Sequence, residues 1–182
     1  DGFRAENCFL FGPSGAGKTT VARAAVRELR REILDVPNAY VNCWKEYTRS
    51  GVLEHLAKNL VNVAVPKNAP ARDLIDKIQS SLNAPSVVIL DEVDQLRDPD
   101  LLYDIHSIRG LSWICIANRE VDLLARLDER VRSRVSVGYR VQFDRYDVDT
   151  VTEILDRRAA QGLDPGAVVR ETLQRIAEMA DG

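Results

Sequence analysis

The fold of this 182-residue chain is decided by residues 10–20, whose sequence is LFGPSGAGKTT. The stretch matches the pattern G-x-x-x-x-G-K-(S/T), and it lies between an apolar run at residues 8–11 and an amphipathic segment at residues 19–31, the expected strand and helix. Gly15 and Gly17 allow backbone angles and a close approach that a Cβ would block, so successive N–H groups can surround a phosphate. The start of the helix directs the positive end of its dipole at the same anion. We therefore predict the phosphate-binding loop of a nucleotide site; the alternative is a glycine-rich turn that only caps a helix.

Two side chains of this loop add charge and metal-binding capacity. Lys18 is expected to neutralise the β- and γ-phosphates, and the Thr19 hydroxyl is placed to bind Mg²⁺. This chemistry predicts ATP or ADP, together with Mg²⁺, as the ligands. The loop residues expected at the nucleotide are Gly12, Pro13, Ser14, Gly15, Ala16, Gly17, Lys18, Thr19 and Thr20.

A second signal is VVILDE at residues 87–92, an apolar run that ends in two carboxylates. The aliphatic residues predict a buried strand, which places Asp91 at the strand end where ligands bind in open α/β sheets. Asp91 can hold Mg²⁺ or its waters, and Glu92 can polarise the water that attacks the γ-phosphate. Asp94 can cap the next turn as well as contact solvent or metal. Without the phosphate-binding loop, a plain acidic turn would be the preferred interpretation.

The next apolar run, at residues 114–117, also ends in a polar residue, Asn118. This amide could hydrogen-bond the γ-phosphate or the attacking water. It could equally make a local Asx turn, and its position alone does not decide between the two.

An arginine cluster follows in LDERVRSR, residues 127–134. Arg130 and Arg134 would share one face of a helix, and a guanidinium offered to a neighbouring subunit's γ-phosphate would stabilise transition-state charge. From the residues alone, an exposed basic turn paired with Asp128 and Glu129 is the favoured interpretation.

Along the whole chain, apolar runs alternate with helical patterns, which is typical of a parallel α/β sheet. The expected strands are residues 8–11, 39–43, 86–90, 111–117 and 139–143. The expected helices lie at about residues 19–31, 52–61, 74–78, 98–107, 147–161 and 166–180, with Val21, Ala25 and Leu29 on the apolar face of the first. We predict a five-stranded parallel sheet flanked by helices over residues 1–144, followed by a partial helical lid over residues 145–182.

The composition excludes several classes of protein. With 45% hydrophobic residues the chain can form a core, and a net charge of −3 argues against a general coat for nucleic acid. No apolar run is long enough to span a bilayer, and no secretory signal is visible, so a cytoplasmic protein is expected. The spacing of Cys8, Cys43 and Cys115 argues against disulfides and zinc. Residues expected to pack or to stay non-catalytic are His55, His106, Trp44 and Trp113, and those expected on a solvated helix face are Arg23, Arg27, Arg30 and Arg31.

Taken together, GPSGAGKTT, VVILDEVD, ANRE and LDERVRSR resemble the AAA+ ATPases, and within them the origin-recognition and cell-division-control initiators of archaea and eukaryotes. YVNC, followed by a threonine-containing turn and a helix, is similar to the second strand and the initiator-specific insertion of that family. DEVDQL and RVRSR are similar to its Walker B and box VII segments. The resemblance covers nearly the whole chain.

The resemblance implies roles for individual residues. Asn118 would be sensor 1, and Arg134, supported by Arg130, would be the finger directed at an adjacent subunit. Tyr146 and Arg158 would match lid residues that face the nucleotide. The sensor 2 arginine, an adenine-contacting segment and a winged-helix DNA-binding domain would lie outside this chain. Candidate phosphate contacts to DNA in the insertion region are Lys45 and Arg49.

The expected function is that of an ATP-binding replication initiator that recognises origins and acts as an ATP/ADP switch, with slow, Mg²⁺-dependent and assembly-dependent hydrolysis. The expected partners are origin double-stranded DNA, other initiator subunits or copies of itself, and the replicative helicase, at the nucleoid in the cytoplasm and without a membrane. The alternatives are a signalling or clamp-loader-like ATPase that assembles on proteins, a small-molecule kinase, and a module that holds ATP without hydrolysing it.

Overall fold

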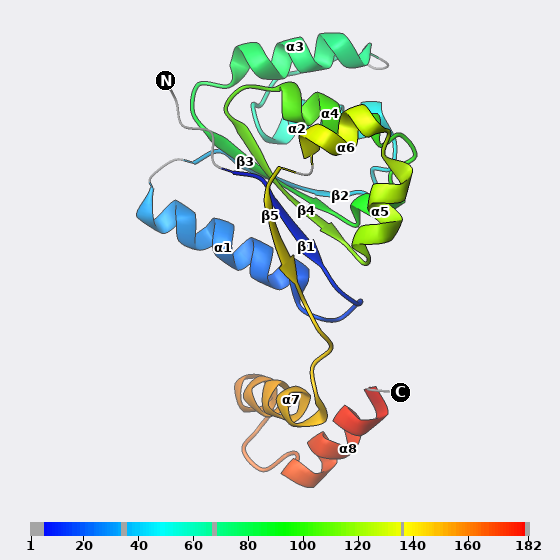
Figure 1. Ribbon diagram of the computed structural model, residues 1–182. Helices are drawn as coiled ribbons and strands as arrows, with labels where there is room; N and C mark the ends of the chain where they lie inside the picture. The colour runs from blue at the N-terminus through cyan, green and yellow to red at the C-terminus, as the bar shows by residue number, and fades with distance from the viewer. Residues whose placement is uncertain (1–5, 34–35, 67–68, 136, 181–182) are drawn as a thin grey trace. The chain divides into compact units, whose positions relative to one another are not determined.

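The residues that the computed structural model describes are 6–33, 36–66, 69–135 and 137–180, with the backbone alone at 134 and 135. The chain divides into two compact units, Asp1–Phe143 and Asp144–Gly182. The first unit contains a β-sheet with helices on both faces, and the second contains two helices (Figure 1).

The sheet of the first unit has the strand order β2-β3-β4-β1-β5, and all of its paired neighbours are parallel. Parallel neighbours need crossover connections, and helices supply most of them here. The predicted fold class, a five-stranded parallel sheet flanked by helices, is therefore confirmed. The strands are β1 (Cys8–Phe11), β2 (Asn38–Asn42), β3 (Ser86–Asp91), β4 (Leu111–Ala117) and β5 (Tyr139–Gln142).

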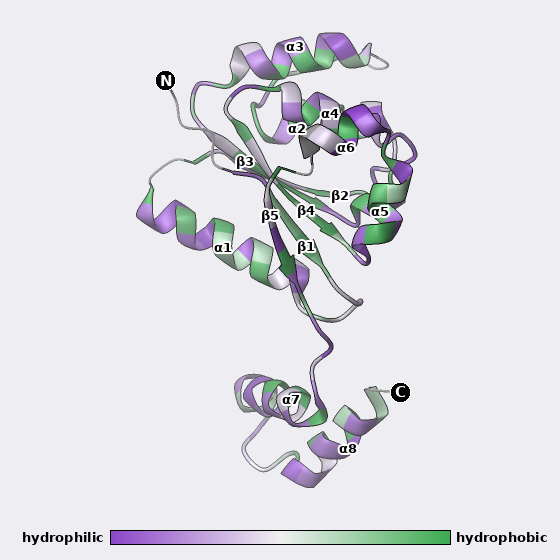
Figure 2. Cartoon of the chain, in the orientation of Figure 1, coloured by the Kyte–Doolittle hydropathy of each residue, from purple (hydrophilic) through white to green (hydrophobic). Residues whose placement is uncertain are grey.

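Helices cover both faces of the sheet. On one face lies α1 (Lys18–Glu32), which packs against an apolar cluster that includes Leu10, Ile89 and Ile116. On the other face a larger core forms, and Figure 2 shows the strands between the two layers as mostly hydrophobic. The helices on that side are α2 (Arg49–Asn59), α3 (Ala71–Ser81), α4 (Asp100–Ser107), α5 (Glu120–Arg126), α6 (Glu129–Val135) and the 3₁₀ turn η1 (Val93–Gln95).

The central strand β4 shows how the sequence produces these two faces. Trp113, Cys115 and Ala117 belong to the larger core, whereas Ile114 and Ile116 lie in the cluster beneath α1. A strand that is buried on both sides is apolar on both faces, and in β4 only Ser112 interrupts the apolar run, which is why this strand could be predicted from the sequence. Trp113 is buried, as expected, and its ring meets that of Phe9 edge-on at 5.0 Å.

Of the three residues predicted for the apolar face of α1, Val21 and Ala25 are wrong, and Leu29 is half-buried. Val21 is 46% exposed and Ala25 is exposed, whereas Lys18, Ala22 and Val26 are buried. Residues four apart lie on one side of a helix, so the side that brings Lys18 to the end of the sheet also buries Ala22 and Val26. The placement of the loop lysine thus fixes the rotation of the helix.

Three other local predictions differ from the structure. Trp44, expected to pack, is 65% exposed, because it lies in the turn after β2, where its N–H donates to the Asn42 side chain. The last helix, α8 (Arg170–Ala180), begins later than predicted, since Gly166 has a φ of 82° and belongs to the preceding turn. Helix α5 was not predicted, because its seven residues are too few to show a helical period.

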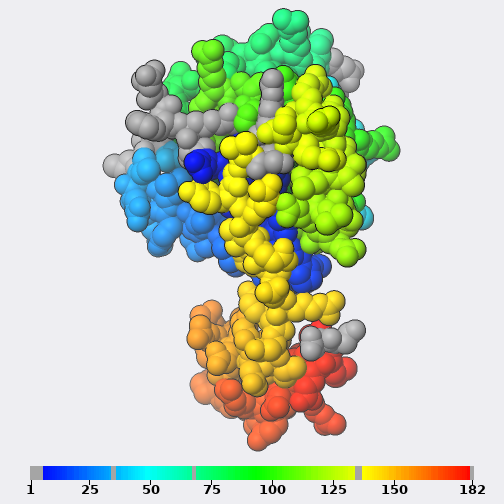
Figure 3. All heavy atoms as spheres, in the orientation of Figure 1, coloured from blue at the N-terminus to red at the C-terminus, as the bar shows by residue number. Residues whose placement is uncertain are grey.

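Strand β5 forms one edge of the sheet, and all four of its residues are exposed. Figure 3 shows this stretch in yellow on the surface of the first unit. Arg140 of β5 pairs with Glu120 of α5 at 2.6 Å. Charged pairs on an edge strand discourage association with other sheet edges.

The second unit consists of α7 (Val148–Gly162) and α8, which pack on each other around Leu173 and Ala177. The Asp147 side chain caps α7 by accepting a 2.7 Å hydrogen bond from the Thr150 N–H, and this contact lowers the pKa of Asp147.

Within the described part of the chain, every helix is too short or too polar to span a bilayer. The three cysteines are free thiols, and burial raises the pKa of Cys43 to about 12.

Candidate nucleotide-binding site

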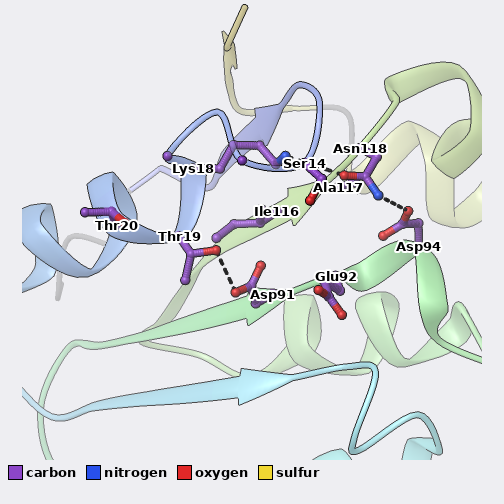
Figure 4. Close-up of a pocket in the computed structure, with 12 residues that line it drawn as sticks. Ser14, Lys18, Thr19, Thr20, Asp91, Glu92, Asp94, Ile116, Ala117 and Asn118 are labelled. Atoms are coloured by element: carbon purple, nitrogen blue, oxygen red, sulfur yellow. Dashed lines mark hydrogen bonds between the residues drawn. The ribbon is translucent and has the colours of Figure 1, made fainter. Parts of the chain in front are cut away.

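A polar pocket opens at the C-terminal ends of β1, β3 and β4, beside the start of α1 (Figure 4). The parallel sheet brings these strand ends to one edge, although the segments are far apart in the sequence. The residues that line the pocket are Ser14, Gly15, Gly17, Lys18, Thr19, Thr20, Asp91, Glu92, Asp94, Ile116, Ala117 and Asn118. The structure therefore brings together the glycine-rich loop, the acidic strand end and the amide that sequence analysis had singled out separately.

The loop between β1 and α1 exposes its backbone to the pocket. Gly15 and Gly17 have φ values of 83° and 84°, in the left-handed region that disfavours a side chain. The Ala16 N–H closes a turn onto the Pro13 carbonyl at 3.3 Å, and Ala16 itself is buried. Ser14, Gly15 and Gly17 of the loop line the pocket together with the first residues of α1, and the backbone N–H groups of such a loop and helix start can bind an anion.

Lys18 lies deep in this loop and is 7% exposed. Its Nζ donates to the carbonyl oxygens of Gly12 at 2.5 Å and Pro13 at 2.7 Å, and lies 3.5 Å from Asn118 Oδ1. Burial lowers the pKa of the Lys18 ammonium, and the nearby carboxylates, Asp91 foremost, oppose that shift. A positive charge is thus held against the phosphate-binding backbone.

Thr19 and Asp91 meet on the opposite side of the pocket. Thr19 Oγ1 donates to Asp91 Oδ2 at 2.8 Å, and the Tyr40 hydroxyl donates to the same oxygen at 2.8 Å. Burial, together with the hydrogen bond to Asp91, raises the pKa of Tyr40, which keeps its hydroxyl a donor. Sequence analysis missed Tyr40, because its proximity to Asp91 depends on the pairing of β2 with β3.

The Thr19 hydroxyl and the Asp91 carboxylate fit a magnesium ion. Both are oxygen donors, and Mg²⁺ typically takes one or two such protein ligands and completes its shell with phosphate oxygens and water. In the described ranges, no group of three or more His, Cys, Asp or Glu side chains could hold a metal by itself. An ion here would therefore depend on a bound phosphate for part of its coordination.

The turn after β3 carries Glu92 and Asp94 toward the same pocket. Glu92 has a φ of 57°, an uncommon conformation for a residue with a side chain. Asn118 Nδ2 lies 3.4 Å from Asp94 Oδ2, so the amide spans two strand ends instead of making only a local turn. The Arg126 guanidinium donates to the carbonyls of Asp94 and Leu96, an anchor that sequence analysis also missed.

Gly12 connects the phosphate-binding loop to the end of the first unit. Its φ is 149°, and a Cβ at this position would lie 2.3 Å from the carbonyl oxygen of Phe143. The Gly12 N–H donates to the Asn118 carbonyl at 3.2 Å, and the Phe143 N–H donates to Phe11 at 2.7 Å. The loop, the end of β4 and the residue after β5 thus meet where a side chain cannot fit.

We expect Gly12→Ala to lower the free energy of unfolding by about 3 kcal/mol, because backbone strain and a clash with Phe143 combine. Chemical denaturation monitored by circular dichroism measures the change. The control is Gly110→Ala, where φ is 78° but a Cβ has open space, so only the conformational cost of about 1 kcal/mol is expected. If the two variants lost the same free energy of unfolding, the clash with Phe143 would not contribute to the destabilisation.

The predicted arginine pair lies on α6. The Arg130 guanidinium carbon lies 4.9 Å from the centre of the Tyr103 ring, and a guanidinium nitrogen lies 3.8 Å from an Asp128 carboxylate oxygen. Arg130 thus makes the ion pair with Asp128 that the exposed-turn interpretation predicted. The backbone of Arg134 follows one turn later, and its side chain lies outside the described atoms. The helix itself, on which the expected shared face depended, is present.

The remaining candidate residues for nucleotide or DNA contacts lie in other parts of the structure. Tyr146 and Arg158 belong to the second unit, where both are exposed. Lys45 is exposed in the turn after β2. Arg49, in contrast, makes two hydrogen bonds to Asp104 at 2.5 and 2.8 Å, so its guanidinium is already engaged by a carboxylate within the protein.

Comparisons with known proteins show the family of this chain. A model of the AAA domain family matches residues 2–136. Two ORC1-type DNA replication proteins of Halobacterium salinarum, numbers 9 and 1, are 39% and 38% identical to the whole chain, which covers 52% and 59% of their lengths. The structure of the Aeropyrum pernix ORC1 protein in complex with DNA superimposes with a TM-score of 0.88 at 28% identity, over 99% of this chain and 50% of that one. The chain thus spans about half the length of the curated relatives it matches.

Proposed function

Since this chain belongs to the AAA domain family and resembles the ORC1-type DNA replication proteins over its whole length, we propose that it is an ATP-dependent initiator of DNA replication. It would act as an ATP/ADP switch with slow, Mg²⁺-dependent hydrolysis. The observation that carries the proposal is the pairing of Thr19 with Asp91 at 2.8 Å in the pocket that also holds Lys18. These are the cation-binding and phosphate-binding elements of one nucleotide site.

In the proposed reaction, this chain's residues bind the triphosphate and position the attacking water. The loop and helix-start N–H groups of residues 14–19 other than that of Ala16, together with the Lys18 ammonium, hold the phosphates. Thr19 and Asp91 would hold Mg²⁺, which when bound supplies neutralising charge at the β- and γ-phosphates. Glu92 orients the water and accepts its proton, while Asn118 donates from its amide to the γ-phosphate or to that water.

Further elements of the proposal depend on other subunits or on the second unit. Arg134, with Arg130 beside it on α6, would reach the γ-phosphate bound by a neighbouring subunit. Tyr146 and Arg158 would face the nucleotide as lid residues. Because Arg130 already contacts Tyr103 and approaches Asp128, we assign the finger itself to Arg134.

The proposed partners are origin double-stranded DNA, other initiator subunits or copies of this chain, and the replicative helicase. The similar Aeropyrum pernix protein was solved in complex with DNA, which supports the first of these. The net charge of −3 means that DNA contacts must be local, and exposed Lys45 is a candidate contact. Arg49 is a weaker candidate, because using it would break its pairing with Asp104.

Isothermal titration calorimetry with ATP and ADP tests the proposal. We expect binding of both nucleotides and tighter binding with Mg²⁺ than with EDTA. Origin DNA added to the full-length protein should bind with an affinity that falls steeply with salt. Nucleotide binding without DNA binding would favour a clamp-loader-like or signalling ATPase, and absence of nucleotide binding would refute the proposal itself.

A further inference from the structure

We propose that Tyr40 is a positioning residue for the magnesium site, and that its hydroxyl, steadied by Arg23, fixes the orientation of the Asp91 carboxylate. This inference rests on the proposed function and adds to it two residues that lie outside the sequence motifs. Tyr40 touches neither phosphate nor metal in this assignment, and acts through Asp91.

The sheet register places the Tyr40 hydroxyl at the carboxylate. Tyr40 on β2 is paired with Ile89 on β3, and Asn42 is paired with Asp91, so the Tyr40 side chain extends two residues along β3. It donates to Asp91 Oδ2 at 2.8 Å, the same oxygen to which Thr19 Oγ1 donates at 2.8 Å. These two hydroxyl donors on Oδ2 fix the orientation of the Asp91 carboxylate. The other oxygen, Oδ1, takes no part in these two hydrogen bonds.

Arg23 holds the tyrosine ring from the side of α1. Its guanidinium carbon lies 3.8 Å from the centre of the Tyr40 ring, which is within the range of a cation–π contact. Arg23 follows Thr19 by one helical turn, so the two residues lie on one side of α1. Sequence analysis placed Arg23 on a solvated face; it is exposed, but it also makes this contact. Helix α1 therefore positions both donors to Asp91, Thr19 directly and Tyr40 through Arg23.

A packing role alone would not require the hydroxyl. The Tyr40 ring packs against the apolar cluster beneath α1, a contact that phenylalanine would keep. A partly buried hydroxyl is costly unless it is hydrogen-bonded, and its partner here is the carboxylate expected to bind the ion. Groups that hydrogen-bond to metal ligands orient them, and their removal commonly weakens metal affinity by about 10–100-fold.

Magnesium affinity in Tyr40→Phe tests the inference without relying on catalysis. ADP is bound to the protein, and Mn²⁺ is titrated as a paramagnetic substitute for Mg²⁺, with free ion measured by electron paramagnetic resonance. We expect about a tenfold weaker metal affinity in Tyr40→Phe. In Arg23→Gln we expect a smaller loss, of about threefold, since only the support of the ring is removed.

The controls separate orientation of Asp91 from general stability. ADP affinity in EDTA should stay within about twofold of wild type in Tyr40→Phe, because a metal-free complex does not use Asp91 as a ligand. Tyr47→Phe, at an exposed tyrosine after β2, should leave both affinities unchanged. Wild-type metal affinity in Tyr40→Phe would overturn the inference, and so would an equal loss with and without metal. If the wild-type protein binds ADP without any response to metal, the proposed function fails as well.

Discussion

Lys18→Ala is expected to weaken ATP binding by about 3 kcal/mol, a rise in Kd of about a hundredfold, because the ammonium group proposed to bind the β- and γ-phosphates is removed. Lys18 is buried at the base of the loop, where water screens its charge poorly. In the structure its donors are directed at the carbonyls of Gly12 and Pro13, which border the phosphate-binding turn. Calorimetry with ATP and Mg²⁺ measures the loss.

Two companion variants isolate the charge of Lys18. Lys18→Met keeps an unbranched apolar side chain and should bind ATP as poorly as Lys18→Ala, because the charge is missing from both. Lys58→Ala, at an exposed lysine on α2, should bind like wild type. If Lys18→Met retained full affinity, the lysine would matter for packing alone, and the assignment of the phosphate-binding loop would be wrong.

The sequence was most informative where one local pattern had one structural solution. The glycine spacing of residues 12–19 and the apolar run before Asp91 predicted a strand, a loop and a strand end, because these patterns are short and specific. Since all strands of the sheet are parallel, the predicted strand ends had to meet at one edge. That rule is why Lys18, Asp91 and Asn118 could be expected in one pocket.

The contacts that sequence analysis missed depend on register and helix rotation. Tyr40 reaches Asp91 only because β2 pairs with β3 in one register, and Arg23 reaches Tyr40 only because α1 is rotated to bury Lys18. Arg126 lies on a helix too short to show periodicity, so its hydrogen bond to the segment after β3 could not be predicted from the sequence. Alternation of side chains along β2 could have placed Tyr40 on the α1 face, but it could not identify the partner.

The turn after β3 is held in place by side chains from other elements, and this bears on the proposed role of Glu92. Glu92 has a left-handed backbone with a φ of 57°, which is sustained when the surroundings fix it. Asn118 contacts the Asp94 side chain, and Arg126 binds the carbonyls on either side of Gln95. The backbone that carries Glu92 is thus fixed before substrate binds, so that only its exposed side chain remains to be oriented, which lowers the cost of reaching the reactive geometry.

Glu92→Gln is therefore expected to reduce ATP hydrolysis by about 10²–10⁴-fold while leaving ATP affinity within about twofold of wild type. Glutamine has nearly the same shape and can adopt the same backbone, so the change removes the proton acceptor and little else. The Glu92 side chain is exposed at the pocket. Within the described residues its carboxylate makes no hydrogen bond that the substitution would break. Single-turnover release of phosphate, with and without DNA, measures the effect together with calorimetric ATP affinity.

A matched control for Glu92→Gln is Glu54→Gln on α2, which makes the same chemical change outside the pocket and should not alter turnover. A slow wild-type rate does not obscure the comparison, because single-turnover measurements resolve slow hydrolysis. Undiminished hydrolysis in Glu92→Gln would remove Glu92 from the mechanism and point to Asp94, the other carboxylate on this turn. Loss of ATP binding in the same variant would instead show that Glu92 stabilises the site, because a proton acceptor acts on the transition state and not on the ground state.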